Sequence, residues 1–284
     1  MDNELFENTP VHKAYIRLAL PLVFSMIVTM IYNLADTYFI AATGNTSLVA
    51  GVSLCAPVFT LLMAFGNIFG QGGTSLISRM LGQKDAAGVR RVSAFCFYGA
   101  LLCGAVVGGI MLIFSGPLLR VLGADDQTLG HAMPYYTVLA IGAPFTVASF
   151  IPSNLLRAEG MSRESMIGSV SGAVLNIILD PILISVCGMG AMGAAIATVA
   201  GYLLSDFYFC MVILKKSRHL SLSPAEIKIS GEQAAQIFGI GIPAAITNIC
   251  SSVCMVLTNQ LLLPYGNDKI AAMGVVLKVT LVAK

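Results

Sequence analysis

The chain has 284 residues, of which 57% are hydrophobic, only 11% are charged and none is tryptophan, and its formal net charge is +2. A soluble domain carries about 25% charged residues because its surface must face water, so this composition excludes a soluble globular protein. A nearly neutral chain also lacks the basic field that binds nucleic acid.

Long apolar segments separated by Gly, Pro, Asn, Asp and charged residues predict helices that cross a membrane. About 20 residues, at a rise of 1.5 Å each, span the ~30 Å hydrocarbon core of a bilayer. In chain order, the predicted spans are 17–42, 48–80, 92–116, 132–156, 165–187, 191–214, 236–263 and a last span that begins near 268. Because these spans hold most of the chain, we expect an all-α integral membrane protein.

The Lys and Arg residues of the short loops are distributed unequally between the two sides that the spans define. Twelve of them fall on the side of the N-terminus, whereas Arg120 and Lys269 fall on the other side. Cytoplasmic loops of membrane proteins carry the excess of Lys and Arg. We therefore expect a multi-pass protein of the cell inner (plasma) membrane with a cytoplasmic N-terminus.

Glycine pairs four residues apart recur within the predicted spans. Such spacing lets two helices approach closely in lipid, where no hydrophobic force drives helices together. The pairs are Gly66 with Gly70, Gly104 with Gly108, and Gly168 with Gly172. We interpret them as packing sites and assign them no chemistry.

A weak internal repeat predicts two lobes. A shift of 222 residues aligns Pro21 with Pro243 without a gap. Many transporters are built from such repeats, so we expect a six-helix N-terminal lobe over 1–220 and an incomplete C-terminal lobe over 221–284, with its first helix and the start of its second. The apolar pattern continues up to Lys284, and on the repeat hypothesis the chain is a fragment of a protein of roughly 444 residues. Alternatively, the seventh span resembles the first only because both are apolar and contain a proline.

Three carboxylates lie within the predicted spans, at Asp36, Asp180 and Asp206. A charge at the centre of a membrane helix costs about 2.5–3.5 kcal/mol, so such residues indicate function. Counted from the span ends, Asp36, Asp180 and Thr198 lie at a common depth of roughly 9–11 Å below the outer boundary. Asn176 shares the helix face of Asp180 one turn deeper. Asp206 has no partner at its own depth, and we expect it to face a water-filled vestibule on the inner side.

The candidate site residues offer only oxygen ligands, which suit protons and hard cations such as Na⁺ and do not suit zinc or copper. These residues are Asp36, Asn176, Asp180 and Thr198. Pro181 has no backbone N–H to donate to the carbonyl of Ile177, so we expect a helix bend or a further cation ligand there. The alternative is that Asp36 and Asp180 each form only a hydrogen bond to a neighbouring helix. The pattern predicts no catalytic residue.

Four separated motifs carry a resemblance to a known family. In chain order they are LADTYFI around Asp36, GNIFGQGGTSLISRMLGQKD over 66–85, LNIILDPILI over 175–184 and GAAIATVAG over 193–201. Together they resemble the multidrug and toxic compound extrusion (MATE) transporters, and most closely the bacterial branch with an acid in the first helix. The resemblance extends over the whole chain as the N-terminal lobe and the start of the C-terminal lobe.

The resemblance implies roles for individual residues. It implies an N-lobe site for Na⁺ or H⁺, formed by Asp36, Asn176, Asp180 and Thr198. It also implies a bend of the first helix at Pro21. Positions that line the drug cavity in relatives fall near Met26, Thr29, Asn33 and Asn154.

The function implied by the resemblance is export of amphipathic or cationic organic compounds, coupled to entry of H⁺ or Na⁺ by alternating access between two lobes. It implies small organic substrates, a bilayer environment, no nucleic acid, no cofactor besides the coupling ion, and a monomer at full length. A flippase for a lipid-linked oligosaccharide or peptidoglycan precursor is an alternative, but the complete spans lack the basic residues that would hold a pyrophosphate. A membrane-embedded enzyme is a further alternative, although HExxH, GxSxG and P-loop motifs are absent.

Overall fold

The computed structural model describes residues 10–280; residues 1–9 and 281–284, at the ends of the two predicted lobes, lie outside the described part. Within that part, the chain forms helices and no strand. The elements are α2 (Val11–Ala42), α3 (Thr46–Leu54), α4 (Ala56–Gly82), α5 (Ala86–Ile113), α6 (Ser115–Leu122), α7 (Asp126–Ala158), α8 (Ser162–Asp180), the π-helix η1 (Pro181–Val186), α9 (Gly190–Lys216), the 3₁₀ turn η2 (Pro224–Glu226), α10 (Gly231–Leu262), the 3₁₀ turn η3 (Leu263–Tyr265) and α11 (Asn267–Thr280).

Seven helical segments of the described chain are long and apolar enough to cross a membrane, which confirms the predicted all-α membrane class. They are Tyr15–Ala42, Thr46–Gly82, Ala86–Ile113, Asp126–Ala158, Ser162–Val186, Gly190–Lys216 and Gly231–Tyr265. Each corresponds to one of the first seven predicted spans, and α11 lies where the eighth was predicted.

The helix ends differ from the predicted spans because polar turns extend the helices beyond the apolar residues. The largest differences are at the starts of α2, α5 and α7, and α5, for example, begins at Ala86 and not at 92. Its first turn is capped by Asp85, whose Oδ1 accepts a hydrogen bond from the Gly88 amide at 2.9 Å. Such a cap satisfies one of the free N–H groups of a helix start, so the helix continues into the polar residues.

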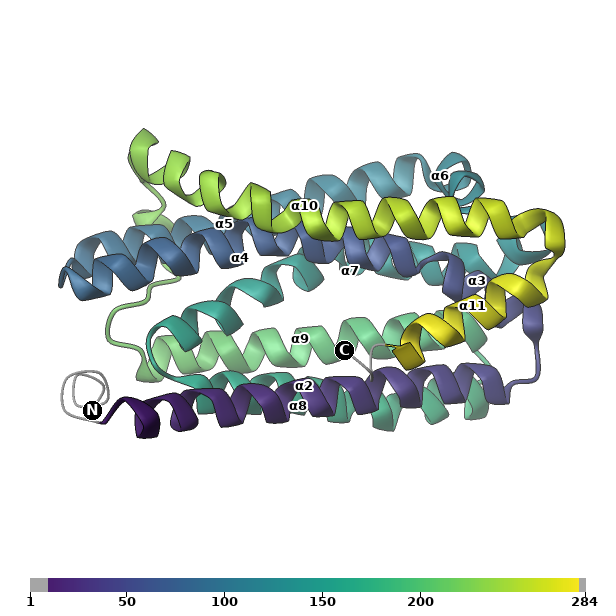
Figure 1. The fold of residues 1–284 in the computed structure, drawn as a ribbon, viewed down its shortest axis with the longest axis horizontal. Coiled ribbons are helices and arrows are strands. Elements are labelled where there is room, and N and C mark those ends of the chain that lie inside the picture. Colours follow the sequence, from purple (N-terminus) through teal and green to yellow (C-terminus); the bar gives the residue numbers. More distant parts are fainter. Residues whose placement is uncertain (1–9, 281–284) are drawn as a thin grey trace.

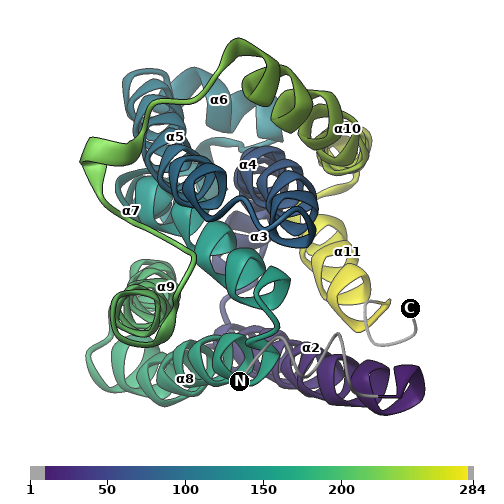
Figure 2. The same ribbon diagram turned by 90° about the vertical axis from the view of Figure 1, so that its left-hand side faces the viewer.

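The long helices run side by side along the longest axis of the molecule (Figure 1). Viewed down that axis, α2, α8 and α9 lie on one side and α4, α5 and α10 on the other (Figure 2). Helix α7 joins the two sides, because it packs against α4, α5 and α9. Helix α8 packs against both α2 and α9, while α10 packs against α4 and α11 against α3.

All three predicted glycine pairs lie at helix contacts. A Cβ on Gly66 of α4 would meet Phe150 of α7. A Cβ on Gly108 of α5 would collide with the carbonyl of Ala140, which is also on α7. A Cβ on Gly172 would collide with Ser205 and the Gly201 carbonyl of α9. The glycines therefore bring backbones together, as the spacing predicts for helices in lipid.

Helix α10 approaches α4 equally closely. A Cβ on Gly241 would collide with the carbonyl of Ile68, and a Cβ on Gly72 would collide with the carbonyl of Ile237. Nearer the other end of the contact, the Ser252 hydroxyl donates a hydrogen bond to the Pro57 carbonyl at 2.7 Å. The seventh span is thus held against the second along much of its length.

We predict that Gly241→Ala destabilises the protein by about 1–3 kcal/mol, because the added methyl group forces α10 away from the α4 backbone. The measurement is thermal unfolding of the purified protein in detergent. Gly239→Ala, in the same helix but with open space around its Cβ position, is the matched control and should be neutral. Equal destabilisation by both changes would contradict the packing argument.

Asp125, between α6 and α7, caps α7 and also links it to the start of α11. Its Oδ1 accepts the backbone N–H of Gln127 at 3.1 Å and of Thr128 at 2.8 Å, which caps α7. Its Oδ2 accepts the side-chain amide of Asn267, from the start of α11, at 2.9 Å. Burial alone would raise the pKa of the Asp125 carboxyl, but these hydrogen bonds outweigh it and lower the pKa below its usual value.

We predict that Asp125→Ala lowers stability at neutral pH by about 0.5–2 kcal/mol, as loss of a helix cap does. Because the folded-state pKa is the lower one, the contribution of the carboxylate is complete above pH about 4 and is lost as the pH falls through the folded-state pKa. Unfolding of the wild type and the variant in detergent should therefore converge in acid. Asp126→Ala, which removes an exposed carboxylate beside exposed Arg120, is the control and should change stability less.

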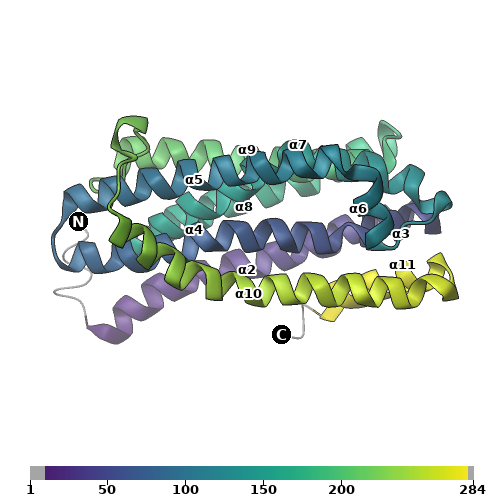
Figure 3. The same cartoon turned by 90° about the horizontal axis from the view of Figure 1, so that it is seen from above.

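The linker over 217–230 is tied to the preceding helices at the end where α2 begins (Figure 3). The buried carboxylate of Glu159 accepts hydrogen bonds from the Ser217 hydroxyl at 2.6 Å and from the backbone N–H groups of Arg218 and His219 at 3.2 and 3.1 Å. Further along, the Ser221 amide donates to the Ser93 hydroxyl of α5 at 3.0 Å. The Tyr98 hydroxyl of α5 donates to the Leu222 carbonyl at 3.0 Å.

Candidate functional site

The predicted cation-site residues come from three helices that pack together. Asp36 lies on α2, Asn176 and Asp180 lie on α8, and Thr198 lies on α9. Asp36, Asn176 and Asp180 are buried, with 7%, 2% and 0% of their surface exposed, and Thr198 is half-buried. Two carboxylates and an amide are thus enclosed among the helices.

The Asn176 side chain forms hydrogen bonds with both Asp180 and Thr198. In the amide orientation that satisfies both of its ends, its Nδ2 donates to Asp180 Oδ2 at 3.1 Å and its Oδ1 accepts from the Thr198 backbone N–H at 3.1 Å. In the opposite orientation its Nδ2 donates to Thr198 Oγ1 at 3.3 Å. In both orientations Asn176 bonds Thr198, so the structure brings three of the four predicted residues into one hydrogen-bonded group.

The fourth residue, Asp36, lies near a tyrosine that is also near Asp180. Tyr135 of α7 lies within electrostatic reach of both the Asp36 and the Asp180 carboxylates. Tyr32, one turn before Asp36, contacts the hydroxyl of Tyr202 on α9. The sequence pattern does not single out these tyrosines, because each is apolar enough to belong to a span and its partners lie on other helices.

The close contact of α8 with α9 positions the cluster. A Cβ on Gly201 would meet the Gly172 carbonyl and Asn176, so only small residues allow the two backbones this approach. One turn further, the Ser205 hydroxyl of α9 donates to the Gly168 carbonyl of α8 at 3.0 Å. These contacts place Asn176 and Thr198 opposite each other.

The helix that carries Asp180 changes form immediately after it. Helix α8 ends at Asp180, and the next residues, from Pro181 to Val186, form the π-helix η1. This change occurs where Pro181 was predicted to interrupt the backbone hydrogen bonds, and π-helical turns are common at functional sites. In contrast, α2 continues through Pro21 as one α-helix, so the structure shows no interruption at this second predicted bend.

Asp206 is buried and does not line an open vestibule as predicted. Only 9% of its surface is exposed, its Oδ1 has no hydrogen-bond partner in the described chain, and Ser149 of α7 lies beside its carboxyl group. It lies one turn after Tyr202, whose hydroxyl contacts Tyr32 of α2. The expectation was wrong because the packing of α7 on α9, which covers Asp206, cannot be read from the α9 sequence.

The residues predicted to lie near a drug cavity are divided between two helices. Met26 on α2 is 59% exposed, while the Thr29 hydroxyl and the Asn33 amide donate to carbonyls of their own helix at 2.8 Å. Asn154 on α7 lies against Gly70 of α4. Its Oδ1 accepts from the Arg157 guanidinium at 2.8 Å. No hydrogen bond of the described residues joins Asn154 to the three residues on α2.

Chemically, the cluster of Asp36, Asn176, Asp180 and Thr198 presents carboxylate, amide and hydroxyl oxygens. This donor set fits a proton or a hard cation such as Na⁺. Within residues 10–280, no group of three His, Cys, Asp or Glu side chains has the arrangement of a site for a softer metal. These four residues present the oxygen atoms that would hold such an ion.

Comparison with known proteins identifies the family. The family model MatE matches residues 21–182, which include Asp36, Asn176 and Asp180. The chain belongs to the MATE family. This confirms the resemblance that the four sequence motifs carry. Among curated relatives, the multidrug export protein MepA of Staphylococcus aureus is 36% identical over 270 residues, which cover 95% of this chain and 60% of MepA. MepA of Staphylococcus saprophyticus is 34% identical over the same length. The chain thus spans 60% of the length of these MATE relatives.

Two solved MATE structures resemble the chain about equally. One, described as the inward-facing conformation of a multidrug resistance MATE family transporter, has a TM-score of 0.84 at 27% identity and covers 93% of this chain and 61% of that chain. The other, described as the outward-facing conformation of such a transporter, has a TM-score of 0.83 at 28% identity and covers 99% and 66%. The fold of the chain is therefore similar to both structures to about the same degree.

We predict that Asn176→Leu, which keeps the side-chain volume but removes the amide, lowers the free energy of unfolding by about 1–3 kcal/mol. The change removes the hydrogen bond that the Asn176 amide donates to the buried Asp180 carboxylate. Thermal unfolding in detergent is the measurement. Asn33→Leu removes an amide that bonds only its own helix and should cost less. If the two changes are equally destabilising, Asn176 is not the centre of a buried network.

Proposed function

We propose that the chain forms the N-terminal lobe and the start of the C-terminal lobe of an exporter of amphipathic or cationic organic compounds, driven by entry of H⁺ or Na⁺. The observation that carries this proposal is the cluster of Asp36, Asn176, Asp180 and Thr198 inside a bundle of apolar helices. Carboxylates are costly in such surroundings and mark ion pathways. The names of the relatives, which are multidrug export proteins, support the class of substrate.

In the proposed mechanism, the cluster binds a cation from outside and substrate export follows from competition. The two carboxylates of Asp36 and Asp180 lie in one poorly solvated group, so a proton or Na⁺ bound there relieves their repulsion. Because Asp36 belongs to α2 and Asp180 to α8, binding alters the contact between these helices. We propose that α2 then moves and displaces the substrate from the cavity between the lobes.

The energy of ion entry is sufficient for export. One elementary charge that moves across 100 mV supplies about 2.3 kcal/mol, which corresponds to a substrate gradient of roughly fiftyfold. Two charges would support a gradient of roughly a thousandfold or more. One coupling cation per cycle therefore meets the need for an uncharged substrate, whereas a monovalent cationic substrate carries one charge outward and needs two coupling cations for the same, roughly fiftyfold gradient.

The placement of basic residues supports a cytoplasmic N-terminus at the plasma membrane. The loops over 83–85, 159–161 and 217–230, with the helix turns beside them, lie at the end where α2 begins (Figure 1). They carry most of the Lys and Arg residues that the sequence analysis assigned to the inner side. We therefore propose that this end faces the cytoplasm.

The observations favour an exporter over the alternatives. A flippase for a lipid-linked precursor needs cations that are free to hold a pyrophosphate, whereas Arg157 in the last turn of α7 donates to Ser153 and Asn154 of its own helix. The relatives are named as export proteins and not as enzymes. We therefore propose no enzymatic activity.

We predict that Asp36→Asn and Asp180→Asn each lower active export by about tenfold or more, because each removes a charge that must bind the coupling cation. The whole gene is expressed in a drug-sensitive host, and efflux of ethidium, an amphipathic organic cation, is measured at matched membrane levels. Imposed gradients of H⁺ and of Na⁺ in vesicles identify the ion.

Asp126→Asn is the control for these variants, because Asp126 is an exposed carboxylate outside the cluster and should leave efflux unchanged. Full export by both cluster variants would reject coupling through these carboxylates. Loss of export by the control as well would show that the assay reports folding or expression and would remove the support for the cluster.

A further inference from the structure

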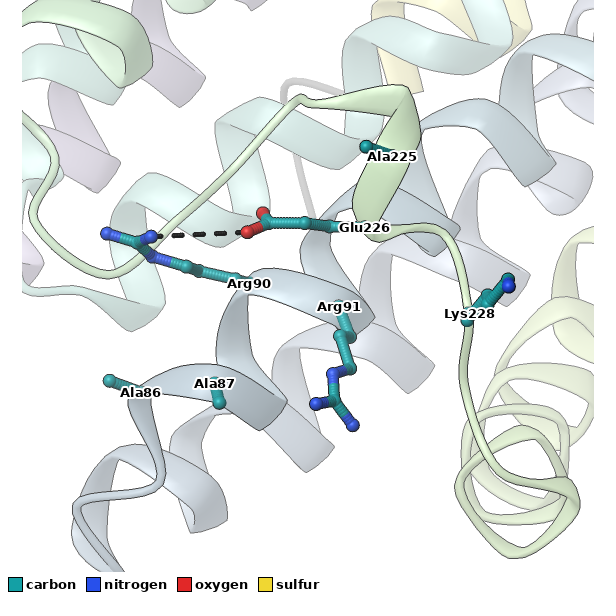
Figure 4. A pocket seen from close by; sticks show the side chains of 7 residues that line it. All are labelled: Ala86, Ala87, Arg90, Arg91, Ala225, Glu226 and Lys228. Atoms are coloured by element: carbon teal, nitrogen blue, oxygen red, sulfur yellow. Dashed lines mark ion pairs between the residues drawn. The ribbon is translucent and has the colours of Figure 1, made fainter.

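The linker between α9 and α10 borders a cavity that opens to the surface at the start of α5. The hydrogen bonds of Ser93 to Ser221 and of Tyr98 to Leu222 hold the linker on α5, and η2 follows directly. Beneath η2 lies a cavity of about 690 Å³. Figure 4 shows the side chains that line it: Ala86, Ala87, Arg90, Arg91, Ala225, Glu226 and Lys228. The three alanines leave the space, and the longer residues supply the charge.

The charge of this cavity is positive. Three cations, Arg90, Arg91 and Lys228, line it with one carboxylate, that of Glu226. Arg90 reaches towards Glu226, but the two charged atoms are 4.0 Å apart and their side chains are 53% and 33% exposed, so this pair is weak. Within residues 10–280, Arg91 and Lys228 form no ion pair. Two positive charges therefore remain for an anion.

The surroundings strengthen the positive field. Arg90 also lines a second cavity of about 330 Å³, together with Arg218 and Ser217 of the linker. The first cavity is large enough for a phosphate group and part of its substituents, and arginine and lysine side chains are the usual ligands of phosphate.

The position of the cavity indicates which phosphate compound it meets. The cavity lies where a long apolar helix, α5, begins and before another, α10, so it is at the level where a membrane helix meets the lipid headgroups. It also lies at the end of the bundle that carries most of the basic residues. Basic pockets between membrane helices on the cytoplasmic side are suited to acidic headgroups.

We propose that the cavity formed by α5 and the α9–α10 linker binds the phosphate group of an anionic phospholipid, with Arg91 and Lys228 as its main ligands. The bound headgroup bridges α5 and the segment that leads into α10. This site is separate from the acidic cluster on α2, α8 and α9, and it does not depend on the export function.

The experiment measures lipid binding to the purified protein in detergent by native mass spectrometry, with phosphatidylglycerol and phosphatidylcholine as probes. We expect the double variant Arg91→Gln/Lys228→Gln to lose about tenfold of its preference for phosphatidylglycerol, since it removes two charge-assisted contacts. The control is Arg79→Gln/Lys215→Gln, which removes the same charge from exposed positions at the same end of the molecule but outside the cavity. It should keep the preference.

A variant that should bind the lipid more tightly distinguishes loss of the site from loss of folding. Glu226→Gln removes the carboxylate from the cavity and should increase the affinity for phosphatidylglycerol several-fold. Equal losses in the double variant and its control, or an unchanged affinity in Glu226→Gln, would reject the site. Displacement of phosphatidylglycerol by excess inorganic phosphate would assign the cavity to soluble phosphate compounds and overturn the lipid proposal.

Discussion

The close contact between the backbones of α8 and α9 is the interaction on which the candidate site depends. In lipid, helices gain little from the hydrophobic effect, so they associate where small residues let backbones approach. Gly172 and Gly201 provide this approach, and Asn176 and Thr198 lie beside them. The hydrogen bond between Asn176 and Thr198 is therefore a result of helix packing, and the Asp180 carboxylate is enclosed by the same contact.

This arrangement explains how a membrane protein tolerates carboxylates in its interior. Asp180 receives the Asn176 amide, and Tyr135 lies near both Asp180 and Asp36. The Asn176 amide and Tyr135 thus lie beside charges that lipid could not solvate. The same arrangement couples the site to the helix packing, because a change in the charge of one carboxylate alters contacts among the helices α2, α7, α8 and α9.

The sequence could predict the features that depend on local pattern. Spans followed from apolar length and the glycine contacts from four-residue spacing. The common level of Asp180 and Thr198 followed from their depth, and the place of Asn176 beside Asp180 followed from helix periodicity. It could not predict the break at Cys55, where the second span divides into α3 and α4, or the burial of Asp206. It also missed Tyr135, because the position of a tyrosine relative to two acids on other helices depends on tertiary packing.

The attachment of the linker has a consequence for how α10 can move. Glu159, Ser93 and Tyr98 fasten the linker to the earlier helices as far as Leu222. Up to that residue, the linker belongs mechanically to the first six spans. A rotation of α10 about these spans would have to be absorbed between Ser223 and Ser230, a joint of eight residues whose own 3₁₀ turn, η2, forms the roof of the basic cavity. A molecule bound in that cavity would therefore act directly on the stiffness of the joint.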